Sequence, residues 1–255
     1  MMQHNLLIAG HTKALSYAAD DLRRRGCTVC NVPDSTVTHI LLPVPSFESD
    51  GTIKGGGVLQ DILATVPPNA VVIGGNLSHP ALAGYDTVDL LQDPLYLAEN
   101  AAITAHCAVK IALNALPVTL QGCPVLVVGW GRIGKCLADL LRRLGARVCV
   151  FARKSADRAM LTALGYEVGD IAPPAYGLMR YRVIFNTAPH PVISESSAAN
   201  CRPECIKIDL ASARGIAGED VIWARGLPNK DAAESSGELI ARSVLRTILR
   251  KEQTL

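Results

Sequence analysis

The most informative stretch of this chain is Pro124-Val125-Leu126-Val127-Val128-Gly129-Trp130-Gly131-Arg132-Ile133-Gly134. Its first five residues are all apolar or Pro, which is typical of a central strand in a parallel sheet. The glycine pattern G-x-G-x-x-G follows directly. Leucine residues then recur with helical spacing as far as Gly145, and a second apolar run covers residues 147–151. The stretch therefore predicts a strand, a glycine turn, a helix and another strand in succession.

Each glycine in this pattern has its own physical reason. Gly129 permits the tight turn, Gly131 lets the backbone approach a pyrophosphate, and Gly134 allows close packing of helix on strand. The start of the helix offers free N–H groups and a positive dipole end to phosphate. We therefore predict a Rossmann-type dinucleotide-binding domain over residues of about 118–230. Its predicted cofactor contacts begin with Gly129, Trp130, Gly131, Arg132, Ile133 and Gly134.

The end of the next strand indicates which dinucleotide binds. An acidic residue at this place would bind the ribose 2′-hydroxyl of NAD, but the chain has Arg153, Lys154 and Ser155. Two cations and a hydroxyl group suit a 2′-phosphate, so we predict that these three residues bind NADP. Asp157 lies close enough in the sequence to leave NAD open.

Three later loops follow predicted strands and should meet at the same edge of the sheet. In such sheets, ligands bind outside the carboxyl ends of the strands. We therefore predict further cofactor contacts at Thr187, Ala188, Pro189 and Asp209. The same argument predicts catalytic or substrate-contacting roles for Ser212 and Lys230. The alternative for each loop is ordinary turn chemistry from Asn, Pro and Gly.

The rest of the chain predicts a second α/β unit. Strand-like and helix-like runs alternate over residues 1–96, without a glycine triplet, and an Ala-rich helical pattern spans residues 97–116. The fold class is thus α/β, with two doubly wound parallel-sheet domains: residues 1–96, onto which a last helix (232–255) packs, and residues 97–231. We expect the 97–116 helix to bridge them and the cofactor to lie in the cleft. Asn100 and Thr104 on that helix are further candidate catalytic residues.

Composition excludes several classes of protein. Hydrophobic residues make up 49% and the formal charge is +2, which argues for a globular protein and against nucleic-acid binding. No apolar run reaches the roughly 18 residues needed to span a bilayer, and no signal peptide is indicated, so we expect a cytoplasmic protein. Cys27 and Cys30 have the spacing of zinc ligands but lie in a predicted strand, where they face opposite sides, so no metal site is predicted.

Several stretches together resemble the A chains of bacterial dipicolinate synthase. They are Leu42-Pro43-Val44-Pro45 with Asp50-Gly51-Thr52-Ile53, residues 93–105, Val127 to Gly134, Ala152-Arg153, Asn186-Thr187-Ala188-Pro189, Ile208-Asp209-Leu210-Ala211-Ser212 and Gly226-Leu227-Pro228. The Asn-Ala-x-x-Thr-Ala helix with the Asp-Leu-Ala-Ser and Gly-Leu-Pro loops is much more specific than the glycine pattern. The resemblance covers nearly the whole chain.

This resemblance implies a function in spore formation. Members oxidise a dihydrodipicolinate-type dicarboxylate to dipicolinate with NAD(P), together with a flavoprotein-like second chain, the B chain of dipicolinate synthase. We also expect a homo-oligomer. The chain departs from the family at residues 229–237, where a Lys and a Thr are lost, although Lys230 and Ser235 or Ser236 could substitute. His11-Thr12 also replaces the usual Gly-Asp after Gly10.

Two other functions stay open at this point. Residues 211–215 resemble the segment of D-2-hydroxyacid dehydrogenases that carries a substrate-binding arginine, here Arg214. Those enzymes need a His–Glu pair further along the chain, and no His follows His190. The second alternative is a non-catalytic NADP-binding regulatory protein, because no acid–base pair is evident in the sequence.

Overall fold

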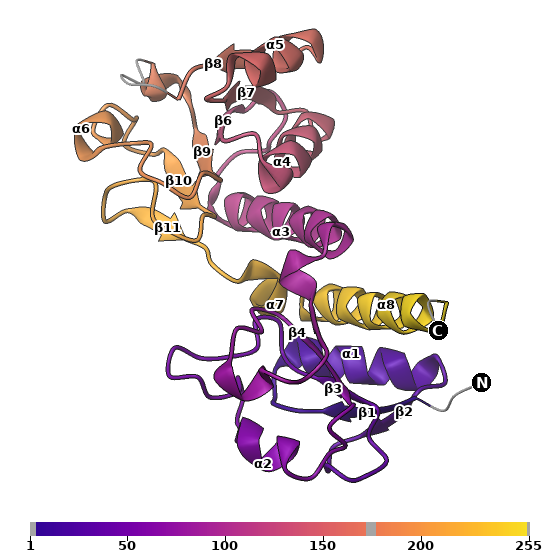
Figure 1. The fold of residues 1–255 in the computed structure, drawn as a ribbon. Coiled ribbons are helices and arrows are strands. Elements are labelled where there is room, and N and C mark those ends of the chain that lie inside the picture. Colours follow the sequence, from indigo (N-terminus) through magenta and orange to yellow (C-terminus); the bar gives the residue numbers. More distant parts are fainter. Residues whose placement is uncertain (1–3, 172–176, 254–255) are drawn as a thin grey trace. The chain divides into compact units, whose positions relative to one another are not determined.

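The computed structural model describes residues 4–171 and 177–253, which form two compact units (Figure 1). Unit 1 consists of the residues up to Asn100 together with those from Pro228 onward. Unit 2 comprises Ala101–Leu227. Each unit is built around its own parallel sheet, so each is described by itself below.

Unit 1 contains a five-stranded sheet in the order β2-β1-β3-β4-β5, with every neighbouring pair parallel. The strands are β1 (Asn5–Ile8), β2 (Thr28–Cys30), β3 (His39–Leu41), β4 (Val71–Gly74) and β5 (Thr87–Asp89). Along the chain, β2 is added on one side of β1, and β3, β4 and β5 are then added in succession on its other side. The switch point of this sheet therefore lies between β1 and β3.

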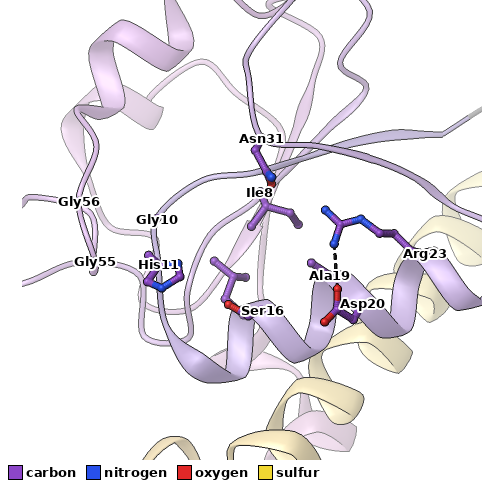
Figure 2. A pocket seen from close by; sticks show the side chains of 11 residues that line it. Ile8, Gly10, His11, Ser16, Ala19, Asp20, Arg23, Asn31, Gly55 and Gly56 are labelled. Carbon is purple, nitrogen blue, oxygen red and sulfur yellow. Dashed lines mark hydrogen bonds and ion pairs between the residues drawn. The ribbon is translucent and has the colours of Figure 1, made fainter.

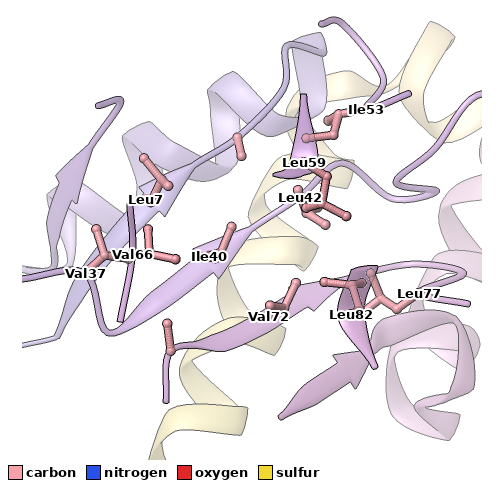
Figure 3. Close-up of a cluster of buried hydrophobic side chains, with 12 residues drawn as sticks. Leu7, Val37, Ile40, Leu42, Ile53, Leu59, Val66, Val72, Leu77 and Leu82 are labelled. Carbon is pink, nitrogen blue, oxygen red and sulfur yellow. The ribbon is translucent and has the colours of Figure 1, made fainter. Parts of the chain in front are cut away.

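The core of unit 1 forms where apolar side chains line up across the strands. Leu7, Ile40 and Val72 are neighbours in register on β1, β3 and β4, and all are buried. They pack with Leu59 of the short helix α2 (Leu59–Leu63) and with Val66 (Figure 3). The alternate residues Leu6, Leu41 and Ile73 are buried as well, so both faces of the sheet are covered, as is usual for a parallel sheet.

Two long helices pack together in unit 1. They are α1 (Lys13–Arg24) and α8 (Ala233–Glu252), which come from opposite ends of the chain. The contact is close at Gly237, where an added Cβ would lie 2.6 Å from the carbonyl oxygen of Ala14. A side chain at residue 237 would therefore push the two helices apart.

The Ala-rich helix α3 (Pro94–Ala115) begins three residues before its predicted start at residue 97. Asp93 caps it, because its Oδ1 accepts a hydrogen bond of 3.0 Å from the N–H of Leu95. Pro94 occupies the first helical position, where proline is favoured and needs no N–H partner. Local capping chemistry therefore explains the earlier start.

Unit 2 contains a six-stranded sheet in the order β11-β10-β9-β6-β7-β8, again with every pair parallel. Its strands are β6 (Pro124–Val128), β7 (Arg147–Phe151), β8 (Glu167–Gly169), β9 (Val183–Asn186), β10 (Ile206–Asp209) and β11 (Val221–Trp223). Its helices include α4 (Arg132–Arg143), α5 (Ser155–Ala163) and α6 (Glu195–Ala198). This order is that of a Rossmann sheet, with the switch point between β6 and β9. The predicted fold class is confirmed.

The structure differs from the predicted elements in its short segments. Residues 227–230 were predicted as a loop but form a short helix, α7 (Leu227–Asp231). The elements α5 and β8 were not predicted at all. Segments this short contain too few turns or alternations for a periodic pattern to reveal them.

Candidate cofactor site

The three glycines of the turn after β6 are required for three different reasons. Gly129 has φ +103°, and an added Cβ would lie 2.4 Å from Oγ1 of Thr187. At Gly134 an added Cβ would lie 2.2 Å from the carbonyl oxygen of Gly129. At Gly131 it would meet no protein atom within 4 Å. Gly129 and Gly134 are therefore needed by the fold itself, whereas Gly131 leaves open space in front of the turn.

The start of α4 faces this open space with unpaired donors. Gly131 is the N-cap residue and supplies no side chain to cap the helix. The N–H of Lys135 is the first to bond back into the turn, to the carbonyl oxygen of Gly131 at 2.9 Å. The first-turn N–H groups of Arg132, Ile133 and Gly134 have no intrahelical acceptor. Together with the helix dipole they form a site for a pyrophosphate, so these residues fit a dinucleotide.

The loop after β9 adjoins the glycine turn at the switch point. The N–H and the hydroxyl of Thr187 both donate to the carbonyl oxygen of Val128, at 2.8 and 3.0 Å. The Asn186 side chain accepts from the N–H of Ala188 at 2.9 Å, and its amide donates to the carbonyl oxygen of that residue. Pro189, the last predicted contact in this loop, is exposed. Asn186, which the sequence placed in this loop without a role of its own, therefore shapes the loop.

Asp209, a predicted cofactor contact, is held by hydrogen bonds within the chain. Its side chain is fully buried, and its two oxygens accept hydrogen bonds from four donors within the chain. These donors are Nδ2 of Asn186 (2.9 Å) and the backbone N–H groups of Ala211 (3.1 Å), Gly215 (2.7 Å) and Ile216 (3.0 Å). Four bonds use the accepting capacity of a carboxylate. Asp209 therefore orders the 210–216 loop, and its predicted contact with a cofactor stays a prediction.

The predicted 2′-phosphate residues lie together where β7 ends and α5 begins. Arg153, Lys154 and Ser155 are all exposed, and Lys154 is the N-cap residue of α5. Neither Arg153 nor Lys154 forms an ion pair with any residue that the structure describes. Arg158 stabilises this turn, because its Nη1 donates to the carbonyl oxygens of Ala152 (2.9 Å) and Arg153 (2.7 Å). This supporting arginine was missed in the sequence, where it reads as an ordinary helix residue.

Trp130, the second residue of the glycine pattern, is half-buried and packs against Tyr166. Its ring meets that of Tyr166 edge to face, with centroids 5.8 Å apart. Nζ of Lys135 lies 5.9 Å from the Trp130 ring centroid. Trp130 is thus a native fluorophore beside the predicted pyrophosphate site.

Arg214 and Arg225, at the 210–216 loop, both contact the indole ring of Trp223. Nε1 of Trp223 donates to the carbonyl oxygen of Ala211 at 3.2 Å. The guanidinium carbons of Arg214 and Arg225 lie 4.9 and 5.1 Å from the Trp223 ring centroid. Neither arginine pairs with a carboxylate within the described part of the chain. Arg225 was not predicted, because only the fold brings residue 225 next to the loop that carries Ser212.

The four predicted catalytic residues are divided between the units. Thr104 is buried within unit 2, and Ser212 is exposed there. Asn100 is half-buried and Lys230 exposed, and both belong to unit 1. Their convergence on one site therefore stays a prediction. Ser236, suggested as a substitute for a lost family residue, is buried with its hydroxyl on Oδ1 of Asn229 at 3.2 Å.

Burial controls the ionisation of three of the cysteine thiols. Burial raises the pKa of the Cys27 and Cys30 thiols, and it does the same for Cys149. A raised pKa disfavours the thiolate form that binds metals. Within residues 4–171 and 177–253 no group of three or more His, Cys, Asp or Glu side chains could hold a metal ion. None of the helices described there is both long and apolar enough to cross a membrane.

Comparison with known proteins supports the resemblance drawn from the motifs. No protein-family model matches the chain. The A chain of dipicolinate synthase from Bacillus subtilis strain 168 is 25% identical over 248 residues, covering 89% of this chain and 82% of that protein. The crystal structure of its counterpart from Bacillus halodurans superposes with a TM-score of 0.84 at 23% identity, covering 96% of this chain and 98% of that one. A transhydrogenase from Sinorhizobium meliloti follows with a TM-score of 0.71 at 18% identity, covering 96% and 93%. In sequence and in fold, over nearly its whole length, this chain resembles the A chain of dipicolinate synthase.

Proposed function

We propose that this chain is an NADP-dependent oxidoreductase that converts a dihydrodipicolinate-type substrate to dipicolinate, acting with a second protein chain. The observation that carries the cofactor assignment is the open space at Gly131, in front of three first-turn N–H groups of α4. A glycine that no protein atom requires, at the anion-binding end of a helix, is what a bound pyrophosphate needs. The Bacillus subtilis relative, named as one chain of a dipicolinate synthase with several chains, supports the substrate and the partner.

The reaction removes two electrons and two hydrogens from the substrate. A bound nicotinamide ring would accept one hydrogen as a hydride, and the other leaves as a proton, so that the ring of the product becomes aromatic. The chain's own task is to hold a substrate with two carboxylates. Arg214 and Arg225, both on the Trp223 ring, offer two cations at the carboxyl end of the sheet. Ser212 lies in the same loop and adds a hydroxyl donor.

The decisive experiment supplies dihydrodipicolinate generated in situ to the purified chain, with and without the B chain of dipicolinate synthase. We expect dipicolinate to form with stoichiometric reduction of NADP when both chains are present. The Gly131→Val variant, which should not bind the cofactor, serves as the matched inactive chain. Dipicolinate formation at the uncatalysed rate with both chains present would support the non-catalytic alternative. Turnover of a 2-hydroxyacid in a substrate panel would instead identify the hydroxyacid dehydrogenase.

The cofactor preference is expected to depend on Arg153. Replacing it with aspartate removes a cation from the 2′-phosphate and adds a carboxylate suited to the 2′-hydroxyl of NAD. A charge-assisted hydrogen bond is worth about 1.5–3 kcal/mol, so NADPH should bind roughly 10- to 100-fold more weakly, while NADH binding should not weaken. Fluorescence titration of both cofactors measures the ratio of the two dissociation constants.

Lys110→Asp is the control for this charge change, because Lys110 is an exposed residue on α3. It should leave the NADPH-to-NADH ratio unchanged. If Arg153→Asp leaves the ratio unchanged as well, the assignment of a 2′-phosphate to this turn is wrong.

A further inference from the structure

Unit 1 has a pocket of about 420 Å³ that the proposed reaction does not use (Figure 2). Ile8 of β1 and Ala19 of α1 form part of its apolar floor. Figure 2 shows the side chains of Asn31 and Arg23 directed into the space beside Ile8. A volume of this size accommodates a small organic ligand.

The pocket lies where an α/β sheet is expected to bind a ligand. It opens at the carboxyl end of β1, one of the two strands at the switch point. The order of elements around the pocket is the same as at the cofactor site in unit 2: a strand, a glycine with positive φ, a helix and a second strand. Gly10 has φ +91°, as Gly129 has φ +103°. Asn31 follows β2 directly, 21 positions after Gly10, which is where a ribose-binding side chain is found in such units.

The turn after β1 cannot hold a pyrophosphate as the turn in unit 2 can. The backbone of Gly55 packs on His11, where an added Cβ would lie 1.9 Å from the carbonyl oxygen of His11. The N–H of His11 donates to the carbonyl oxygen of Lys54 at 3.0 Å. This loop covers the backbone that would meet the phosphates. This turn therefore does not offer the pyrophosphate site that a dinucleotide needs.

The polar wall of the pocket is nearly neutral and suits hydroxyl groups. Asp20 and Arg23, one helical turn apart on α1, form an ion pair of 2.9 Å between Oδ1 and Nη1. This pair cancels most of the local charge, while the other oxygen of Asp20 can still accept from a hydroxyl. The Asn31 amide both donates and accepts, and Ser16 adds a hydroxyl at the same wall.

We propose that this pocket binds a ribonucleoside, with its ribose hydroxyls held by Asp20 and Asn31 and its base over Ile8 and Ala19. Ala19 is buried, so the half-buried side chain of Ile8 supplies the exposed apolar surface for one face of a base, and the neutral wall favours a nucleoside over a charged ligand. This site is separate from the cofactor site in unit 2 and does not depend on the reaction proposed above.

The test is equilibrium dialysis of the four common ribonucleosides against the full-length Gly131→Val variant. That substitution blocks the pyrophosphate position in unit 2 but not by itself a nucleoside, so the Asn31→Ala and Asp20→Ala variants decide which unit binds the ligand. We expect saturable binding of at least one ribonucleoside in a 1:1 ratio. Adding Asn31→Ala or Asp20→Ala should weaken it at least 10-fold, and the 2′-deoxynucleoside should bind more weakly than the ribonucleoside. Asp61→Ala, on the exposed surface of α2 in the same unit, should have no effect.

Three results would overturn the proposal. The first is no saturable binding of any of the four ribonucleosides to Gly131→Val. The second is binding to the wild-type chain that Gly131→Val abolishes, which would assign the nucleoside to the cofactor site. The third is binding that neither Asn31→Ala nor Asp20→Ala changes. Thermal denaturation checks that each variant keeps its fold. We expect that it does, because Asp20 and Asn31 are both exposed.

Discussion

Replacing Gly131 with valine is expected to weaken NADPH binding at least about 100-fold, equivalent to roughly 2.7 kcal/mol, while the chain stays folded. The added side chain enters the space in front of the α4 N-terminus and keeps a pyrophosphate from the first-turn N–H groups. The fold tolerates it for two reasons. Residue 131 has φ −78° and ψ −170°, an extended conformation open to any residue, and an added Cβ meets no protein atom within 4 Å. Loss of glycine from the N-cap position costs only about 1 kcal/mol or less.

Gly134→Ala is the matched control: it should destabilise the fold, which Gly131→Val should not. Its Cβ would lie 2.2 Å from the carbonyl oxygen of Gly129, so α4 must move away from β6. We expect the melting temperature to fall clearly in Gly134→Ala but to change little in Gly131→Val. NADPH titration, followed through the fluorescence of the cofactor and of Trp130, measures binding. An NADPH dissociation constant within about threefold of wild type in folded Gly131→Val would refute the cofactor site.

Asp209→Ala is expected to lower the free energy of unfolding by roughly 3–5 kcal/mol. The substitution leaves four buried donors without an acceptor, namely three backbone N–H groups of the 210–216 loop and the Asn186 amide. In a chain of this size that loss lowers the melting temperature by about 10 °C. Urea denaturation measures the free energy, and hydrogen exchange at Ala211, Gly215 and Ile216 should show where protection is lost.

Two further variants make this result specific. Asp209→Asn keeps the shape but turns an NH₂ group toward N–H donors, so it should fall between the wild type and Asp209→Ala. Asp139→Ala removes a carboxylate that is 42% exposed and pairs with Arg143 on the surface of α4, which should cost at most about 1 kcal/mol. A loss below about 1 kcal/mol in Asp209→Ala would show that the buried bonds do not order the loop.

Much of unit 2 could be predicted because its signals are local. The apolar run of β6, the glycine pattern and the start of α4 lie within eleven consecutive residues. Each imposes its structure on its immediate neighbours through strand burial, backbone freedom and helix geometry. The same reasoning located Arg153 and Lys154, since the residues that follow a parallel strand lie at its carboxyl end.

The parts that could not be predicted depend on contacts between distant residues. Asn186 and Asp209 are 23 positions apart but bond to each other because β9 and β10 are neighbours in register. That contact, with the loop amides, gives Asp209 a role in ordering the loop that its place in the sequence does not reveal. Arg214 and Arg225 contact the same ring because Trp223 lies against the 210–216 loop, where its Nε1 bonds to the carbonyl oxygen of Ala211. No pattern in the sequence marks such pairs.

The fold class, the glycine turn and the family that the chain resembles thus follow from the order of its residues alone. Which of these residues are available for binding follows from the folded structure. The fold uses Gly129 and Gly134 for packing and leaves Gly131 open, and it occupies the carboxylate of Asp209. The physical reason is that a side chain binds a ligand only with the hydrogen-bonding capacity and space that the fold has not already taken. The capacity and space that are left depend on all the neighbours in three dimensions and not on the residue type.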